Sequence, residues 1–259
     1  MEDRAVQYQV QGPAAVLTLN RPQARNALSA EVMAGLFEGL ARAEASPEVR
    51  AVVLTGAGDR VFCAGGDLSS IASDGFLSGH DGRRRYGELM LRLQGLKKAT
   101  VARVNGHALA GGLGLVLACD LAVAVDSAEF GTPEIDRGLF PMQVVALLQR
   151  HVGRKRALEL VLTGARLGAA QALEWGLLNR VVPAAQLDST VGALATALAG
   201  KSQAVLALGR RAFFAAEDLP LAGAVEFLAG QLSLNVLAED AAEGVTAFLE
   251  KRSPQWKDR

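Results

Sequence analysis

The stretch TVARVNGHALAGGLGLVLACDLAVAV, residues 100–125, decides the fold. Its β-branched opening, Thr100–Val104, predicts a strand that ends at an Asn-Gly pair. The apolar segment 110–119 then predicts a buried helix with a glycine-rich N-terminus, and the run Asp120–Val125 predicts a second strand. Strands that alternate with helices in this way predict an α/β fold, in which helices cover a sheet.

The residues before this stretch extend the alternation. Two β-rich runs, Ala5–Gln11 and Ala14–Asn20, flank a Gly-Pro turn and predict a hairpin at the edge of the sheet. Ser29 precedes apolar residues at helical intervals, which predicts a capped amphipathic helix, and Arg50–Thr55 predicts the next strand. The polar stretch Ser69–Asp81 predicts a mobile loop, followed by a helix from about Gly82 to Lys98.

The end of the chain has a different pattern. From about Pro183 onward, Ala, Leu and Phe recur at helical intervals and no further strand pattern appears. We therefore divide the chain into a core of residues 1–190 and a C-terminal helical region of residues 191–259. Because a helical tail outside the sheet leaves apolar faces free, we expect this region to make subunit contacts.

Charge and hydropathy exclude several kinds of partner. Lys plus Arg and Asp plus Glu both number 27, so the net charge is zero and there is no strong field to hold nucleic acid or an acidic membrane surface. The sequence has no run of about 18 uncharged apolar residues and its start lacks a signal-peptide core. We expect a soluble, cytoplasmic protein. Cys63 and Cys119 lack metal-ligand spacing, so we expect reduced, buried thiols and no metal site.

Two glycine clusters are candidates for binding negative charge. AGGD at 64–67 and AGG at 110–112 each follow a predicted strand and lie at or near a helix start, where backbone N–H groups lack partners. Together they are able to bind a developing oxyanion, although each cluster alone is more typical of a turn or of close helix packing. Glycine-rich loops also occur in phosphate-binding loops and in dinucleotide-binding folds. Neither interpretation holds here, because the sequence pattern of each is absent.

Glu134 is the candidate acid/base. It follows Pro133 directly, a position where a carboxylate commonly stabilises the first turn of a helix. Taken in isolation, the segment favours that structural role.

Seven ordered motifs across nearly the whole chain resemble the enoyl-CoA hydratase/isomerase (crotonase) family. They are RPQARNAL (21–28), LTGAGDRVFCAGGDL (54–68), NGHALAGG (105–112), FGTPEI (130–135), LTG (162–164), ALEWGLLNRVVP (172–183) and EGVTAFLEKRSP (243–254). The resemblance implies a crotonase-like spiral of ββα units with a C-terminal helical trimerisation region, assembled as a trimer or a dimer of trimers. It also implies an acyl-CoA thioester as substrate, with no cofactor.

The resemblance also assigns roles to individual residues. The amides of Gly66 and Gly111 would hold the thioester oxygen, and Glu134 would move protons. The CoA moiety would be bound by Ala24, Arg25, Ala64, Asp67 and Leu68, joined by Phe248 and Lys251 across a subunit boundary. One lysine that commonly contacts CoA falls on Gln23 here. Arg25 and the cluster Arg83–Arg85 are therefore candidates for the phosphates, although a triple arginine is more typical of a solvated helix face.

The match departs from the family at the first of two catalytic glutamates, because Gly114 stands there. We place reversible hydration of a 2-enoyl-CoA first. The alternatives are a 3-enoyl to 2-enoyl-CoA isomerase that uses Glu134 alone, a catalytically silent acyl-CoA binder and, less favoured, a scaffold. Asp74, Glu88, Asp136 and His107 are candidates to assist Glu134, with a structural role favoured for His107. If the missing glutamate limits hydration, Gly114→Glu should raise it.

One further apolar segment follows Glu134. Residues 138–142 are Gly-Leu-Phe-Pro-Met, where many relatives carry a smaller glycine-rich turn. We therefore expect an unusually shaped acyl pocket that suits branched or polar acyl groups.

Overall fold

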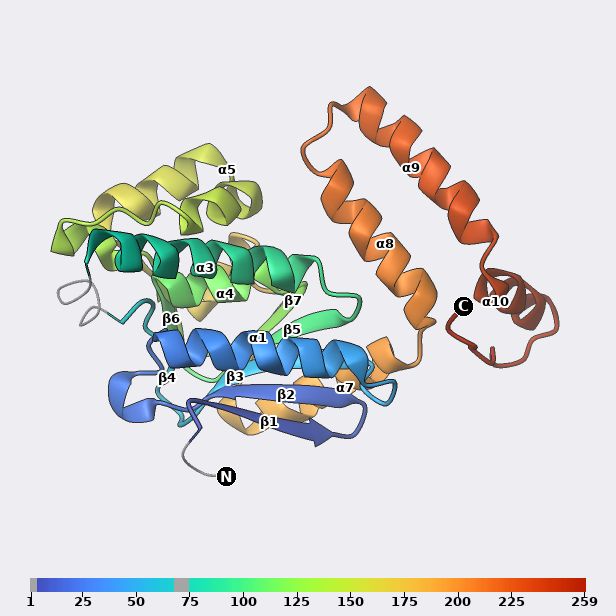
Figure 1. Cartoon of the computed structure of the whole chain (residues 1–259), viewed down its shortest axis with the longest axis horizontal. Helices are drawn as coiled ribbons and strands as arrows, with labels where there is room; N and C mark the ends of the chain where they lie inside the picture. The colour runs from blue at the N-terminus through green and yellow to red at the C-terminus, as the bar shows by residue number, and fades with distance from the viewer. Residues whose placement is uncertain (1–3, 68–74) are drawn as a thin grey trace.

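The computed structural model describes residues 4–67 and 75–259, which form two sheets wrapped by helices (Figure 1). The larger sheet has six strands in the order β1-β2-β3-β5-β7-β10. Its strands are β1 (Val6–Gln11), β2 (Ala14–Leu19), β3 (Ala51–Gly56), β5 (Ala99–Val104), β7 (Leu121–Val125) and β10 (Arg180–Val182). The edge hairpin β1–β2 is antiparallel and the other pairs are parallel. The predicted hairpin and α/β sheet are thus confirmed.

The smaller sheet has four short strands, in the order β4-β6-β8-β9. They are β4 (Val61–Cys63), β6 (His107–Leu109), β8 (Glu129–Gly131) and β9 (Arg166–Gly168). Three times in succession the chain passes from a strand of the larger sheet to one of the smaller sheet and then into a helical segment. These segments are α3 (Phe76–Gln94), α4 (Gly111–Ala118) and η2 (Pro133–Arg137) with α5 (Val144–Thr163). The expected spiral of ββα units is confirmed.

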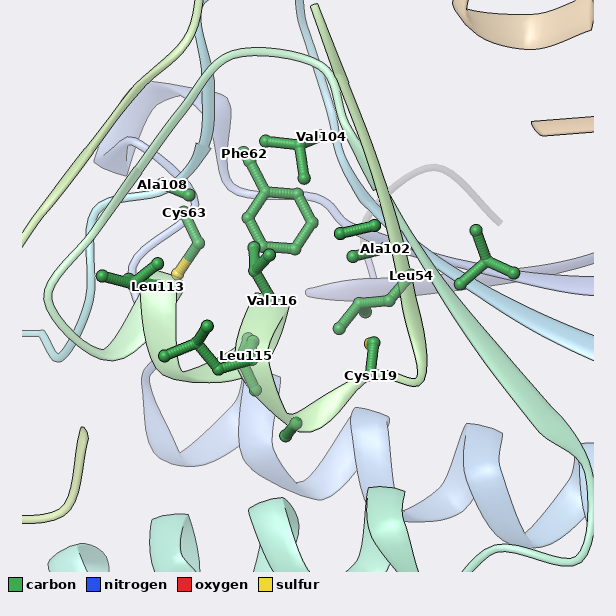
Figure 2. Packing of buried hydrophobic residues seen from close by; sticks show 14 of the residues in the cluster. Leu54, Phe62, Cys63, Ala102, Val104, Ala108, Leu113, Leu115, Val116 and Cys119 are labelled. Atoms are coloured by element: carbon green, nitrogen blue, oxygen red, sulfur yellow. The ribbon is translucent and has the colours of Figure 1, made fainter. Parts of the chain in front are cut away.

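Helix α4 forms the centre of the core. Its residues from Gly112 to Ala118 are all buried, because the segment has no charged side chain that would need water. Figure 2 shows Leu113 and Val116 of α4 against Phe62 and Cys63 of β4. A Cβ on Gly112 would overlap the backbone of Cys63, so only glycine lets this helix approach β4 so closely. This packing fixes the N-terminus of α4 beside the loop that follows β4.

Helix α1 (Ala30–Ala45) begins where the sequence predicts. The hydroxyl of Ser29 accepts a hydrogen bond from the backbone N–H of Val32 at 3.3 Å, which caps the helix. Its buried side chains, among them Val32, Leu36 and Leu40, face the core at helical spacing. α1 therefore covers the sheet beside α3.

Helix α3 corrects the prediction of a long loop. It spans Phe76–Gln94, so the predicted mobile stretch is helical from Phe76 onward and the helix ends before Lys98. Residues 68–74, including Leu68 and Asp74, lie outside the described residues. The first turns hold poor helix formers and no buried side chain, so local propensity favours a loop. Tertiary contacts decide otherwise, since Gln143 Nε2 donates to the Arg83 carbonyl at 2.8 Å.

The end of the chain is helical, as predicted, and its last two helices extend away from the sheets (Figure 1). After α6 (Ala169–Glu174), α7 (Leu187–Ala199) buries three side chains and packs on strands β3, β5 and β7. It crosses residue 190, the expected boundary between core and tail. Figure 1 shows α8 (Gln203–Ala216) and α9 (Leu221–Val236) side by side, with α10 (Glu239–Leu249) beyond them.

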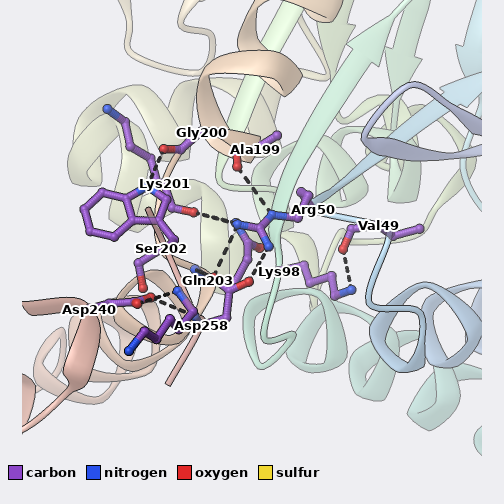
Figure 3. Close-up of polar contacts among 12 residues, drawn as sticks. Val49, Arg50, Lys98, Ala199, Gly200, Lys201, Ser202, Gln203, Asp240 and Asp258 are labelled. Atoms are coloured by element: carbon purple, nitrogen blue, oxygen red, sulfur yellow. Dashed lines mark hydrogen bonds and ion pairs between the residues drawn. The ribbon is translucent and has the colours of Figure 1, made fainter. Parts of the chain in front are cut away.

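Polar contacts tie the end of the chain to the sheet (Figure 3). The Arg50 guanidinium, just before β3, donates to the carbonyls of Ala199 and Lys201 at 3.3 and 3.2 Å and pairs with Asp258. Asp240 is buried and accepts from the backbone N–H groups of Lys257 and Asp258 at 2.7 and 2.9 Å. The final residues are therefore anchored to both α10 and the core.

The fold agrees with the expectation for the two cysteines. Cys63 and Cys119 are free and buried, as predicted, and burial raises the pKa of each thiol to about 12.

Within residues 4–67 and 75–259, no single helix is long and apolar enough to cross a membrane. Two pairs of helices joined at a sharp bend are long and apolar enough together, judged by length and composition alone. They are Ala184–Ala199 with Gln203–Ala216 and Leu221–Val236 with Glu239–Leu249.

Candidate functional site

A pocket of about 550 Å³ lies between the N-terminus of α1, helix α3, the start of α4 and the segment after β8. Its apolar lining comes mainly from Leu28, Met33, Phe140, Pro141 and Met142. The apolar segment after Glu134 thus lines the pocket. Polar groups gather in the same space, namely Asp67, Arg83, Arg85, Tyr86 and Glu134, together with the backbones of Gly66 and Gly111. A largely apolar pocket with a few convergent polar groups is typical of a small-molecule site.

The first glycine cluster contributes Gly66 to the wall of this pocket. Leu28 bonds on both sides of Gly66: its N–H donates to the Gly65 carbonyl at 2.8 Å and its carbonyl accepts from Asp67 at 3.2 Å. Because Leu28 uses these flanking groups, the N–H of Gly66 points away from it. A Cβ on Gly66 would meet no atom within 4 Å, so this position faces open space.

The second glycine cluster lies beside the first. Gly111 is the first residue of α4, so its N–H has no partner in the preceding turn of the helix. The preceding residue, Ala110, has a φ of 54° and is held by its N–H, which donates to the Gly131 carbonyl at 2.8 Å. Gly65 has a φ of +96°, and a Cβ there would lie 3.0 Å from the Gly111 nitrogen. The two clusters therefore touch, and Gly66 and Gly111 line one pocket.

Glu134 lies in η2, shortly after β8, and lines the pocket. Its Oε2 is buried and has no hydrogen-bond partner among the described residues. Burial raises the pKa of the Glu134 carboxyl above its usual value, against the opposing effects of its own backbone N–H and of Arg137. A carboxyl with a raised pKa and a free oxygen is suited to accept and return a proton. The environment of Glu134 therefore suits an acid/base, in addition to the helix first-turn role that the segment favours in isolation.

Tyr86 is a pocket residue that sequence reasoning missed. Its hydroxyl donates to the carbonyl of Gly111 at 2.7 Å. Burial raises the pKa of the Tyr86 hydroxyl well above its usual range, and the charges of Cys63 and Glu134 raise it further. The signal for it was helical spacing, because Tyr86 precedes the buried Met90 and Leu93 by four and seven residues. That spacing places Tyr86 on the inner face of α3.

Four of the predicted CoA-binding residues lie along one strip. The N–H of Ala64 donates to the Arg25 carbonyl at 3.1 Å, next to the Leu28–Gly66 bridge. Asp67 pairs with Arg21 at 2.9 Å, a partner that the sequence did not indicate. Ala24 precedes Arg25 directly, and both are at least partly accessible. The segments 24–28 and 64–67 therefore run side by side at the rim of the site.

Asn26 holds this strip in place. It is fully buried with a φ of 54°, and its Nδ2 donates to the carbonyls of Ala57 and Val61 at 3.0 and 2.8 Å. Asparagine tolerates this left-handed conformation because its short amide bonds to nearby backbone. Asn26 thus has a structural role that positions the neighbouring Arg25.

The remaining predicted residues lie elsewhere. Phe248 lies at the end of α10 and Lys251 lies in the turn that follows it, and neither lines the pocket of this chain. All of Arg83–Arg85 are exposed, as expected of a solvated face, yet Arg83 and Arg85 also line the pocket. Arg84 instead pairs with Glu88 at 3.4 Å on the surface.

Of the candidate assistants of Glu134, Glu88, Asp136 and His107 do not line the pocket, and Asp74 lies outside the described residues. Glu88 pairs on the surface as above, and Asp136 is exposed in η2. His107 accepts the N–H of Glu129 on its Nδ1 at 3.1 Å, a structural contact between β6 and β8. In the parts of the chain that the structure describes, no three His, Cys, Asp or Glu residues gather as metal ligands.

Comparison with known proteins gives a consistent result along the sequence. A profile described as enoyl-CoA hydratase/isomerase matches residues 9–259. The chain is 38% identical over 248 residues to a putative enoyl-CoA hydratase of Thermus thermophilus, a match that covers 95% of this chain and 98% of the relative. It is 35% identical over 248 residues to a carnitinyl-CoA dehydratase of Proteus mirabilis, with 94% of each protein covered.

Comparison of the fold with solved structures also finds proteins described as enoyl-CoA hydratases. The crystal structure of an enoyl-CoA hydratase from Mycobacterium smegmatis is similar with a TM-score of 0.93 and 37% identity, over 97% of this chain and 98% of that one. Similarity of this extent covers the sheets, the pocket and the C-terminal helices together.

Proposed function

The chain belongs to the enoyl-CoA hydratase/isomerase family, and on that premise we propose that it catalyses the reversible addition of water to a 2-enoyl-CoA thioester. One observation carries this proposal. Glu134 lines the same pocket as Gly66 and Gly111, and its buried Oε2 has no hydrogen-bond partner among the described residues. An acid/base group and two amide donors in one largely apolar pocket suit a reaction that passes through an enolate.

In this reaction the thioester oxygen accepts hydrogen bonds from the amides of Gly66 and Gly111. Glu134 removes a proton from water, and the resulting hydroxyl bonds to C3. The electron pair of the C2–C3 double bond moves toward the thioester oxygen, where the two amides stabilise its charge. Glu134 then returns the proton to C2, so the reaction needs no cofactor.

Isomerisation of a 3-enoyl to a 2-enoyl thioester is the second candidate. Two carboxylates are present among the described pocket residues, but Asp67 is paired with Arg21. Glu134 is therefore the one placed to exchange protons, and Gly114 offers no second carboxylate. A single base suffices to take a proton from C2 and return it to C4. A catalytically silent acyl-CoA binder is the third reading, which would retain the same two amides.

The substrate would lie with its acyl chain in the pocket and its CoA moiety along the strip at the rim. We place the CoA near Ala24, Arg25, Ala64, Asp67 and Leu68, of which Leu68 is outside the described residues. The exposed cations Arg83 and Arg85 at the pocket supply charge for the phosphates in place of a lysine at Gln23.

We also propose self-association as a trimer or a dimer of trimers, which the surface of the helical tail supports. On α9, Leu221, Val225, Leu228 and Leu232 are exposed on one face, with exposed fractions from 40% to 81%. A continuous apolar stripe on a soluble protein marks an interaction surface. In such an assembly Phe248, which is 82% exposed, and Lys251 would reach the site of a neighbouring subunit.

The proposal is tested by assaying the purified protein with matched 2-enoyl-CoA and 3-enoyl-CoA substrates. Loss of the conjugated absorbance together with a 3-hydroxyacyl-CoA product supports hydration. Formation of the conjugated thioester from the 3-enoyl substrate without hydration supports the isomerase instead. No turnover of either substrate, with thioester binding retained, supports the binder.

A further inference from the structure

The space above Gly114 is filled by Tyr86. A Cβ placed on Gly114 would overlap the Tyr86 hydroxyl oxygen, and it would lie 3.3 Å from the ring carbon that bears this oxygen. Gly114 belongs to the second turn of α4, whereas Tyr86 comes from α3. A side chain missing from α4 is thus replaced in space by a hydroxyl from another helix.

The Tyr86 hydroxyl is held in a defined orientation. Its proton is donated to the Gly111 carbonyl at 2.7 Å, on the residue whose N–H is a proposed oxyanion donor. A phenolic oxygen that donates one hydrogen bond keeps lone pairs that accept another. Because Tyr86 lines the pocket together with Glu134, these lone pairs are available to a small molecule bound beside the carboxyl group.

We propose that the Tyr86 hydroxyl holds the water that adds to the substrate, which makes Tyr86 a second catalytic residue beside Glu134. This inference rests on the proposed hydratase function. The water donates one hydrogen to the Tyr86 oxygen and the other to the Glu134 carboxylate. Two acceptors fix its position and aim one of its two lone pairs at C3.

The step balances without a further reactant. Glu134 takes one proton of the water while the water oxygen bonds to C3, and the π pair moves to the thioester oxygen. Glu134 then gives that proton to C2. The hydrogen that Tyr86 accepted as a hydrogen bond stays on the new hydroxyl group, and the Tyr86 proton stays on its own oxygen, hydrogen-bonded to the Gly111 carbonyl.

This arrangement separates two reactions that share Glu134. Hydration requires the water and therefore Tyr86, whereas transfer of a proton from C2 to C4 requires no water. Tyr86→Phe removes the acceptor and keeps the ring that packs beside Gly111 and Gly114. The isomerase reaction serves as an internal check that the folded pocket survives.

The experiment measures both reactions and thioester affinity for the wild type, Tyr86→Phe and a matched control, Tyr8→Phe. Tyr8 is the chain's other tyrosine, and it packs under Arg42 away from the pocket. For Tyr86→Phe we expect kcat for hydration to fall about 10- to 100-fold. We expect its isomerisation rate and thioester affinity to stay within about twofold, a split that loss of structure would not give. Tyr8→Phe should match the wild type.

Gly114→Ala tests the same hydroxyl from the other helix. Its methyl group would displace the Tyr86 oxygen, so it should lower hydration selectively too, and adding it to Tyr86→Phe should cost little more. Equal hydration by Tyr86→Phe and the wild type would overturn the role of Tyr86 while leaving the proposed function in place. A parallel fall of both reactions in Tyr86→Phe would also overturn it. A wild type inactive on the 2-enoyl thioester would overturn the proposed function first.

Discussion

At the scale of single residues, the environment of Glu134 sets a conflict between activity and stability. A buried carboxylate oxygen without a partner destabilises the charged form, which raises the pKa of the group in the folded chain. The folded protein therefore holds this proton to higher pH than the unfolded chain does. The stability that depends on it is complete below the unfolded pKa and is lost as the pH rises through the folded pKa.

This linkage predicts a pH-dependent gain in stability for Glu134→Gln. The neutral amide removes the cost of burying charge, so Tm should rise at pH 8 by roughly 2–4 °C. Near pH 4 the wild-type carboxyl is protonated and the difference should vanish. Thermal unfolding across this pH range checks the prediction. Equal Tm values of the variant and the wild type at pH 8 would show that the ionised Glu134 carboxyl does not destabilise the fold.

The amide of Gly66 gives a second prediction at this scale. Gly66→Pro deletes the N–H that we assign to the thioester oxygen, and its Cβ would meet no atom within 4 Å. We expect kcat to fall on the order of 100-fold, in line with the loss of one oxyanion donor elsewhere. Steady-state kinetics on a variant shown to be folded by circular dichroism provide the measurement. A folded variant with wild-type rates would exclude this amide.

The structure also reverses one expectation about Gly114. From the sequence we expected Gly114→Glu to raise hydration by restoring a carboxylate. Because Tyr86 already fills that space, the single substitution forces α3 and α4 apart or displaces the hydroxyl. Nothing in the sequence joins residues 86 and 114, which meet only when α3 packs against α4.

At the scale of elements, the sequence specified those whose local signals agree with their environment. α4 was predictable because its apolar residues carry no charge, and α1 because Ser29 caps a helical spacing. The start of α3 was not, since its glycines and polar residues favour a loop and only contacts such as Gln143 with Arg83 hold it helical. Tyr86 was missed because it lies in that same helix.

The apolar stripe on α9 gives a prediction for this scale. Val225→Asp should dissociate the proposed assembly into smaller species without unfolding the chain, because Val225 is 61% exposed in the single chain. Light scattering coupled to size exclusion measures the change. Val10→Asp is the control, an exposed apolar residue of β1 outside the tail that is 49% exposed. An unchanged mass for Val225→Asp would contradict an α9 interface.

At the scale of the whole molecule, the spiral explains how distant motifs form one site. Because the chain passes from the larger to the smaller sheet in each unit, the loops after β4, β6 and β8 open on the same side. They deliver Gly66, Gly111 and Glu134 to one pocket. The motifs indicated these residues one by one, while the distances among them depend on packing that no local pattern encodes.

The closure of the chain end onto the core is a property of the whole fold. Arg50 contacts two carbonyls and Asp258, and its side chain is only 21% exposed. Arg50→Ala should lower the free energy of unfolding by about 1–3 kcal/mol because it leaves these groups without their donor. The exposed Arg4–Glu38 pair is the control, and Arg4→Ala should change stability by less than about 0.5 kcal/mol. Urea unfolding measures the free energy of unfolding of both variants. Equal losses for Arg50→Ala and Arg4→Ala would show that Arg50 does not anchor the end of the chain.

The most direct test of the account is the turnover of a 2-enoyl-CoA by Glu134→Gln, measured beside its affinity for the same thioester. Removal of the acid/base should lower kcat at least about 100-fold, while the two amides and the pocket keep the affinity within a few-fold of the wild type. Turnover of the variant at the wild-type rate would contradict the assignment of Glu134 as the group that moves the proton.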